Sequence, residues 1–281
     1  MYKIKNKTLI KDMPPTTITI LDQDVDVEGN TPSYYRMLVN NEHFKYITID
    51  PKIYQVDDMS FPPVLLSMLP AFPSGDWNFG CISRTAENST AFFAETSKRD
   101  FPSIKPAWHT KSYDYLSFKL QLRAGPSVYI ASSPQFEKPI IAKFARFGWE
   151  IDYFINETKA YSWIDGHNIG PKFLGYLTEE GRVIGFLMEN VEGRHATISD
   201  LPACKAVLTR LHDLGILHNG LQRHKFLISE AGAVLLDFDT AQRSEDSEAM
   251  QKEMWELEDQ LLNESDNSGL VLSEDEEMEE E

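Results

Sequence analysis

The sequence predicts an α+β fold with a β-rich N-terminal extension and an acidic C-terminal tail. Three observations support this prediction. Hydrophobic residues make up 42% of the 281 residues, which is enough to bury a sizeable core. Runs rich in β-branched and aromatic residues fill much of the first part of the chain, whereas two later stretches repeat apolar residues at helical spacing. Acidic residues gather at the C-terminal end.

Residues 1–113 are expected to form the β-rich extension, made of strands and loops. The segment YYRMLVNNEHFKYITID contains two β-rich runs that meet at Asn40 and Asn41. Because asparagine tolerates the positive φ of a tight turn, a hairpin is predicted there. The next segment, FPPVLLSMLPAFPSGDWNFG, contains repeated prolines and glycines that are expected to interrupt regular structure.

Residues 114–190 are expected to combine a small sheet with one helix. DYLSFKLQLRAGPSVYIASS and KPIIAKFARF predict two or three strands. A helix is predicted in WEIDYFINETKAYSWI, because one helical face would carry Ile151, Phe154, Ile155, Thr158, Tyr161 and Ile164. GPKFLGYLTEEGRVIGFLMENVEG is typical of a strand pair that turns at Glu180 and Gly181.

Residues 191–243 are expected to hold a second helix, a loop and a buried strand. Ser199 or Asp200 is the predicted N-cap of the helix, and Gly215 suits its left-handed end. Its apolar face would carry Leu201, Cys204, Val207, Leu208, Leu211 and Leu214. The strand AVLLDFDTA ends in two carboxylates, and EAMQKEMWELEDQLL predicts a last helix.

Negative charge is concentrated in residues 244–281, which are predicted to form an acidic helix and a disordered tail. The formal net charge is −17, and this segment holds 16 acidic residues and one basic residue, a net −15. The remaining 28 acidic and 26 basic residues leave the rest of the chain nearly neutral. The end of the chain, SEDEEMEEE, is therefore interpreted as a solvated tail.

Several classes of protein are disfavoured by the composition. We find no basic stripe for nucleic acid and no apolar run long enough to span a membrane. The start, MYKIKNKTLIKDMPP, lacks the apolar core of a secretory signal. Only Cys81 and Cys204 are present, so no disulfide framework is expected. These observations predict a cytoplasmic location, with a nuclear location left open.

The order of the motifs resembles that of the aminoglycoside-phosphotransferase and protein-kinase superfamily. A lysine in a strand is followed by a glutamate in the next helix, a strand that leads into a connector, another helix, a histidine-containing loop, and a strand that ends in Asp-Phe-Asp. The chain resembles more closely a family of small fungal kinase-like proteins that automatic pipelines often label "alpha-galactosidase A". The runs that match this family are AKFARFGWEIDYFINETKAYSWI, IGPKFLGYLTEEGRVIGFLMENV, and LHDLGILHNGLQRHKFLI before LLDFDTA. The resemblance covers roughly residues 114–243, and nothing in these motifs supports a glycosidase.

This resemblance implies a protein-kinase-like two-lobed fold, with residues 114–190 as the small lobe and residues 191–243 as a truncated C-lobe. It implies that Lys143 holds the α- and β-phosphates of ATP and that Glu157 orients this lysine. It also implies that Asp237 holds Mg²⁺. From the residues alone, Lys143 and Glu157 can also be a surface pair, and Asp237 a turn or cap residue.

The histidine-containing loop lacks the two side chains that phosphotransfer needs. Active kinases of this type place an aspartate two residues after the histidine and an asparagine five residues further on. Aligned on His218 and Leu221, this chain has Gly220 and Lys225 at those positions. A glycine cannot orient a nucleophile, and a protonated lysine cannot bind magnesium. The phosphate loop is also poor, because LQLRAGPSVY offers only Gly125, next to a proline. No catalytic residue is therefore predicted.

His212, His218 and His224 follow one another at six-residue steps, which is not a metal-binding spacing. His218 is expected to brace the loop, and His212 to be a partly buried helix residue.

Two classes of function stay open. The favoured one is a pseudokinase that binds a nucleotide or small ligand, with ATP and Mg²⁺ as expected cofactors, and that acts as a regulatory or scaffold protein with a possible protein partner. The alternative is an enzyme, either a small-molecule phosphotransferase of unusual mechanism or a kinase fold reused in fungal secondary-metabolite biosynthesis. The loss at Gly220 and Lys225 favours the first class, because it argues against phosphotransfer.

Overall fold

The structure is a computed structural model that describes residues 16–85, 90–105 and 107–263. The chain divides into two compact units, residues 1–100 and residues 101–281, which are described separately. The described residues form four sheets and five α-helices, so the predicted α+β class is confirmed. The predicted disordered tail lies mostly in residues 264–281, outside the described residues.

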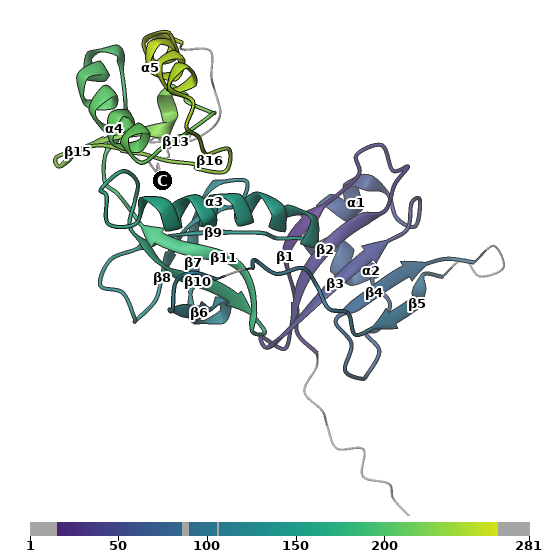
Figure 1. Cartoon of the computed structure of the whole chain (residues 1–281). Helices are drawn as coiled ribbons and strands as arrows, with labels where there is room; N and C mark the ends of the chain where they lie inside the picture. The colour runs from purple at the N-terminus through teal and green to yellow at the C-terminus, as the bar shows by residue number, and fades with distance from the viewer. Residues whose placement is uncertain (1–15, 86–89, 106, 264–281) are drawn as a thin grey trace, which may run out of the picture. The chain divides into compact units, whose positions relative to one another are not determined.

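The first unit contains a five-stranded sheet with the order β1-β2-β3-β4-β5 (Figure 1). Only β3 and β4 run parallel among these neighbours. The predicted hairpin is confirmed, because β2 and β3 pair around Asn40 and Asn41, whose φ angles are 55° and 56°. The strands are β1 (Ile18–Asp24), β2 (Ser33–Val39), β3 (His43–Ile49), β4 (Phe79–Ser83) and β5 (Phe92–Ser97).

Two short helices in the first unit were not expected from the sequence. They are α1 (Val56–Ser60) and α2 (Pro62–Met68). The prolines of this segment had been taken as interruptions, but in α2 they occupy the first turn of the helix. A proline fits there, because its fixed φ is helical and the amide that it lacks would have no partner within the helix.

The second unit contains a six-stranded sheet with the order β6-β10-β11-β9-β8-β7, in which only β6 and β10 pair in parallel (Figure 1). The predicted turn between β10 and β11 is confirmed, with positive φ angles of 48° at Glu180 and 81° at Gly181. The strands are β6 (Ser112–Asp114), β7 (Lys119–Gly125), β8 (Val128–Ser132), β9 (Ile140–Phe144), β10 (Phe173–Glu179) and β11 (Arg182–Glu189).

The segment that leads into this sheet belongs to the second unit. Strand β6 lies beside β10, and the amide of Ile104 donates to the carbonyl oxygen of Val183 at 3.0 Å. The sequence had placed residues 101–113 in the N-terminal extension. Hydrogen bonds of Ser103, Ile104 and Lys111 instead connect this segment to β10 and β11 of the six-stranded sheet, and the division of the chain falls after Asp100.

Three longer helices complete the second unit. Figure 1 shows α3 along one face of the six-stranded sheet, and α4 packs against α5. The helices are α3 (Ile151–Ile164), α4 (Leu201–Asp213) and α5 (Ser247–Leu262), and all three were predicted. Short 3₁₀ turns cover Tyr115–Ser117, Gly148–Glu150, Ile198–Asp200 and Arg223–Lys225. Two small sheets are formed by β12 (Arg194–His195), β14 (Phe226–Ser229) and β15 (Gly232–Leu235), and by β13 (Ile216–Leu217) and β16 (Gln242–Arg243).

The start of α4 differs from the prediction, whereas its end does not. Asp200 is the N-cap residue, but its side chain does not cap α4. Its carboxylate instead accepts from the amide of Thr197, at 2.8 Å, and from the guanidinium of Arg194. This happens because a 3₁₀ turn precedes the helix and carries its own capping box. Gly215 ends the helix with φ 69°, as predicted.

The core of the second unit joins the sheet to all three helices. Its fully buried aromatic residues include Phe186 on β11, Phe226 on β14 and Phe238 after β15. From α4 it takes residues of the predicted apolar face, including Leu208, with no exposed surface, and from α5 it takes Leu257 and Leu261, the latter with 2%. Burial of this apolar surface holds α3, α4 and α5 against the strands. Within the described residues, no helix has the length and apolar character that a membrane crossing needs.

Candidate functional site

The three residues predicted for the site lie at one point of the second unit. The Lys143 ammonium on β9 donates to the Glu157 carboxylate on α3 at 2.8 Å. It also donates to Asp237, in the segment after β15, at 2.5 Å. The exposed side-chain fractions are 12% for Lys143, 2% for Glu157 and 39% for Asp237. Lys143 and Glu157 are therefore not a surface pair, and Asp237 forms the more open side of the cluster.

The position of Lys143 is fixed by the strands on both sides of β9. Within the sheet, Lys143 is paired with Phe186 on β11 and with Val128 on β8. Gly185 of β11 lies so close to β9 that a Cβ there would collide with the Lys143 carbonyl oxygen and with Phe144. The glycine is needed for this close approach, which brings the lysine opposite the buried face of α3.

Asp237 has a φ of 58°, which is unusual for a residue with a side chain. This backbone conformation comes directly before Phe238, which is fully buried between Tyr161 and His218, each with a ring centroid 5.4 Å away. These edge-to-face and tilted ring contacts join α3 to the histidine-containing loop through Phe238, the residue next to Asp237. Gly170 allows it, because a Cβ there would lie 2.8 Å from the Phe238 ring.

The charges of the cluster shift one another's pKa values. Burial disfavours the charged form of Lys143, but the carboxylates of Glu157 and Asp237 outweigh this effect and raise the pKa of Lys143. Burial raises the pKa of Glu157, against the attraction of Lys143. Burial also opposes ionisation of Asp237, yet Lys143, and to a lesser degree Lys225, lower its pKa. The ammonium and the Asp237 carboxylate are therefore charged at neutral pH.

The position of Gly220 is surrounded by groups other than carboxylates. A Cβ built there would lie 2.8 Å from the Thr240 hydroxyl oxygen, 3.2 Å from the Lys225 ammonium and 3.8 Å from His218 Nδ1. These are its three nearest atoms, and none of them belongs to a carboxylate. The Thr240 hydroxyl donates to the carbonyl oxygen of His218 at 2.9 Å.

His218 braces the loop, as predicted. It is fully buried, and its Nε2 lies 3.0 Å from the Leu236 carbonyl oxygen. Because a carbonyl only accepts, Nε2 carries the hydrogen. Burial lowers the pKa of His218, so the ring is neutral near pH 7.

Glu253 on α5 is an important residue that the sequence did not identify. Its carboxylate accepts from the amide of Asn219 at 2.7 Å and from the amide of His218 at 3.2 Å. His212 Nε2 lies 2.7 Å from the same carboxylate, and the His212 side chain is 10% exposed, which agrees with the predicted partly buried helix residue. The histidine-containing loop is therefore held on α5. The sequence held one signal for this residue: Glu253, Leu257 and Leu261 follow at four-residue spacing and so share one helix face, and the two leucines of that face are buried.

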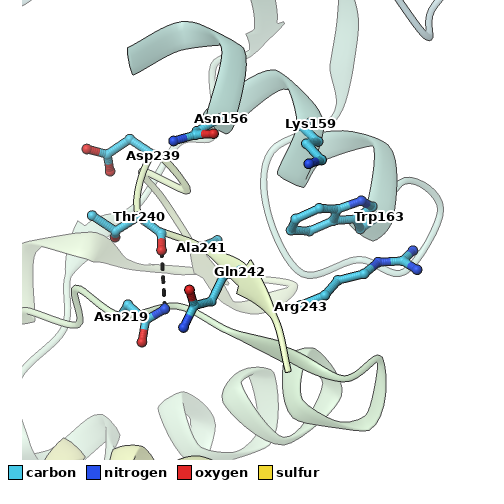
Figure 2. A pocket seen from close by; sticks show the side chains of 9 residues that line it. All are labelled: Asn156, Lys159, Trp163, Asn219, Asp239, Thr240, Ala241, Gln242 and Arg243. Atoms are coloured by element: carbon cyan, nitrogen blue, oxygen red, sulfur yellow. Dashed lines mark hydrogen bonds between the residues drawn. The ribbon is translucent and has the colours of Figure 1, made fainter. Parts of the chain in front are cut away.

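An open pocket of about 1040 Å³ lies between α3 and the segment after Asp237, as Figure 2 shows. Its lining residues are Asn156, Lys159, Trp163, Asn219, Asp239, Thr240, Ala241, Gln242 and Arg243. Lys159 and Arg243 flank the ring of Trp163, at 5.7 Å and 5.3 Å from its centroid. Lys143, Glu157 and Asp237 are not among the residues that line this pocket, although Asn156 and Asp239 are close to them in the sequence.

The residues of the site do not fit a magnesium ion well. One oxygen of Asp237 already accepts from Lys143, and the charged group close to Gly220 is the Lys225 ammonium, which cannot bind a metal ion while it is protonated. Across residues 16–85, 90–105 and 107–263, no three His, Cys, Asp or Glu side chains are grouped so that they could hold a metal ion.

Comparison with known proteins gives no family for this chain: no protein-family model matches the sequence, and no curated protein is significantly similar to it.

Proposed function

We propose that residues 101–281 form a kinase-like unit that binds a nucleotide or another small anionic ligand beside Lys143, and that the protein acts as a regulator or scaffold. The observation that carries this proposal is the junction of Lys143, Glu157 and Asp237, which come from a strand, a helix and the segment after a second sheet. The same order of elements supports a kinase-like arrangement of two lobes, with the six-stranded sheet and α3 in one and α4 and α5 in the other.

The lysine keeps a donor for a ligand. An ammonium has three N–H donors, and Glu157 and Asp237 accept two of them. The third is free for a phosphate or carboxylate oxygen on the open side, where Asp237 is 39% exposed. The two carboxylates aim the flexible side chain and reduce the entropy that ligand binding would otherwise cost.

The groups around Gly220 favour binding over phosphotransfer. None of the three atoms nearest to a Cβ at Gly220 belongs to a carboxylate that could orient the hydroxyl of an acceptor for attack on a phosphate. Loss of such a base lowers a rate by about a hundred- to ten-thousand-fold. The turn between β7 and β8 points the same way, because Pro126 in this turn has no amide hydrogen to offer. This tight turn offers few amides to a phosphate.

Thermal-shift titration with ATP and ADP tests the proposal. A ligand that binds only the folded state raises the melting temperature as its concentration rises above its Kd. We expect a shift with the full chain and a smaller one in Lys143→Gln. Lys205→Gln, which changes an exposed lysine on α4, is the matched control and should keep the full shift. The absence of a shift with any nucleotide would refute nucleotide binding.

Incubation with γ-labelled ATP and cell extract separates the regulator from the enzyme. We expect no labelled product above the level of a reaction without the protein. A labelled small molecule that depends on Lys143 would instead establish a phosphotransferase, and the proposed function would then be wrong.

A further inference from the structure

We propose that Lys225 gives this site a contact for phosphate that needs no metal ion: its ammonium binds the terminal phosphate of a nucleotide directly. This inference rests on the proposed function, because it concerns a ligand held beside Lys143. Lys225 is then one more residue that binds the ligand, and the ligand is a nucleotide that carries no magnesium.

Lys225 is firmly placed by its backbone but has an unengaged side chain. Its amide donates to the Gln222 carbonyl oxygen at 3.0 Å, and its own carbonyl oxygen accepts from the amide of Leu236 at 2.9 Å. The second bond ties Lys225 to the residue directly before Asp237. Its ammonium makes no hydrogen bond or ion pair within the described part of the chain. A partly buried ammonium that makes no hydrogen bond is only partly compensated by the charge of Asp237, and an incoming anion would supply the missing hydrogen bond.

The lysine occupies this place because residue 220 is a glycine. A Cβ at Gly220 would lie 3.2 Å from the Lys225 ammonium and 2.8 Å from the Thr240 hydroxyl, which is itself bonded to the loop backbone. An aspartate there would crowd Thr240 and would also pair with Lys225, so that the ammonium would no longer be available to a ligand. The loss of the aspartate and the gain of the lysine are therefore one coupled change.

The charges of Lys225 and Lys143 both act on the Asp237 carboxylate. The positive charge of Lys225 contributes to the lowered pKa values of Asp237 and His218, so it reaches both residues. The Asp237 carboxylate thus accepts from the Lys143 ammonium and also feels the charge of the Lys225 ammonium, whose backbone is bonded to the residue before Asp237. The two ammonium groups would attract a triphosphate and repel a divalent cation, and ATP without magnesium carries more negative charge than its magnesium complex.

Isothermal titration of the full chain with ATP, in EDTA and in excess MgCl₂, tests this inference. We expect binding in EDTA at least as tight as in MgCl₂. Lys225→Gln should weaken binding in EDTA by about ten-fold or more, the usual loss for one charge-assisted hydrogen bond. Lys225→Arg should keep most of the affinity, and Lys205→Gln should match the wild type. AMP, which lacks the terminal phosphates, should bind wild type and Lys225→Gln equally.

The outcomes separate the inference from the function on which it rests. If ATP binds only with MgCl₂, or if Lys225→Gln binds ATP in EDTA as tightly as the wild type, the inference is wrong while nucleotide binding stands. If ATP binds neither in EDTA nor in MgCl₂, both the role of Lys225 and the proposed nucleotide binding are wrong. Melting temperatures of the variants close to that of the wild type ensure that a lost affinity is not a lost fold. Lys225→Asn adds a gain of function, because its amide oxygen can accept a metal and should make binding stronger with MgCl₂ than with EDTA.

Discussion

Lys143 Nζ and Asp237 Oδ1 lie 2.5 Å apart, although the two residues are 94 positions apart in the sequence. With Glu157 bonded to the same ammonium, the pair joins β9, α3 and the segment after β15 at a single nitrogen atom. The cluster is thus part of the stability of the second unit as well as its candidate binding site. Mutations at these positions should be examined for both effects.

Lys143→Met should destabilise the second unit. The change leaves the Glu157 carboxylate, which is 2% exposed, without its counter-charge. Breaking a buried ion pair in this way costs about 3 kcal/mol of unfolding free energy, which urea denaturation at pH 7 would measure. Glu157→Gln combined with Lys143→Met should recover part of the loss, because no buried charge remains at position 157. Lys252→Met, which removes an exposed pair with Glu256, serves as the control and should change little. Equal losses in the two lysine variants would contradict the prediction.

Glu253→Gln should lower the unfolding free energy by an amount that depends on pH. Burial opposes ionisation of Glu253, but hydrogen bonds from His212, Asn219 and His218 outweigh it and hold the pKa below its ordinary value of 4.5. A depressed pKa gives stability that is present above the ordinary value and is lost as the pH falls through the folded-state value.

The difference between wild type and Glu253→Gln should therefore be about 2 kcal/mol near pH 7, the range for hydrogen bonds to a charged group. It should shrink as the pH falls below 4.5. Denaturation curves from pH 7 to pH 3 give this comparison. A difference that stays constant over this range would show that Glu253 does not act through its charge.

Gly170→Ala should weaken the ring contacts of Phe238 with Tyr161 and His218, which hold the segment after β15. The added Cβ would lie 2.8 Å from the Phe238 ring and 3.1 Å from the Leu235 carbonyl oxygen, so one of them must move. Overpacking of this kind costs about 1–3 kcal/mol, which would appear as a lower melting temperature. Gly125→Ala is a suitable control, because its Cβ would meet Val128 at an ordinary 3.6 Å.

A double-mutant cycle with Phe238→Leu tests the cause of the Gly170 effect. If the ring is what the new methyl group strikes, the smaller leucine should absorb part of the damage, and the two losses should not add. If the two losses of stability simply add, the new methyl group does not act through the Phe238 ring.

Gly220→Asp combined with Lys225→Asn should not restore phosphotransfer. The aspartate would have to displace the Thr240 hydroxyl, 2.8 Å from its Cβ, and the turn between β7 and β8 would still offer few amides. A filter assay with γ-labelled ATP and a panel of small hydroxyl compounds should give rates no higher than those of the wild type. Robust turnover would show that the two substitutions alone had silenced the site.

Local patterns in the sequence predicted much of the fold. Helices α3 and α4 follow from apolar residues at helical spacing, and the hairpin follows from Asn40 and Asn41. Helix α2 was not predicted, because prolines interrupt a helix interior but suit a first turn, and the sequence does not say which of these applies. The division after Asp100 was not predicted either, because it depends on the pairing of β6 with β10, which are far apart in the chain.

The candidate site shows the same limit. Lys143, Glu157 and Asp237 were predicted to meet because the order of the motifs resembles that of kinase-like proteins, whereas the residues alone left a surface pair and a turn or cap aspartate open. Glu253 was not predicted, since its partner amides lie 34 and 35 residues away and the sequence marked its segment only as an acidic helix. The orientation of Lys225 depends on atoms around Gly220 that no local pattern reveals.

Gly185 has a consequence for how this protein can diversify. Since any side chain there would strike the backbone that carries Lys143, a substitution would spread the strands and misdirect the ammonium, whatever the residue's polarity. Loop positions near the ligand can change and give new binding preferences, but descendants that keep the lysine in place must also keep the glycine opposite it. Position 185 should therefore be among the least variable in any lineage that retains this site.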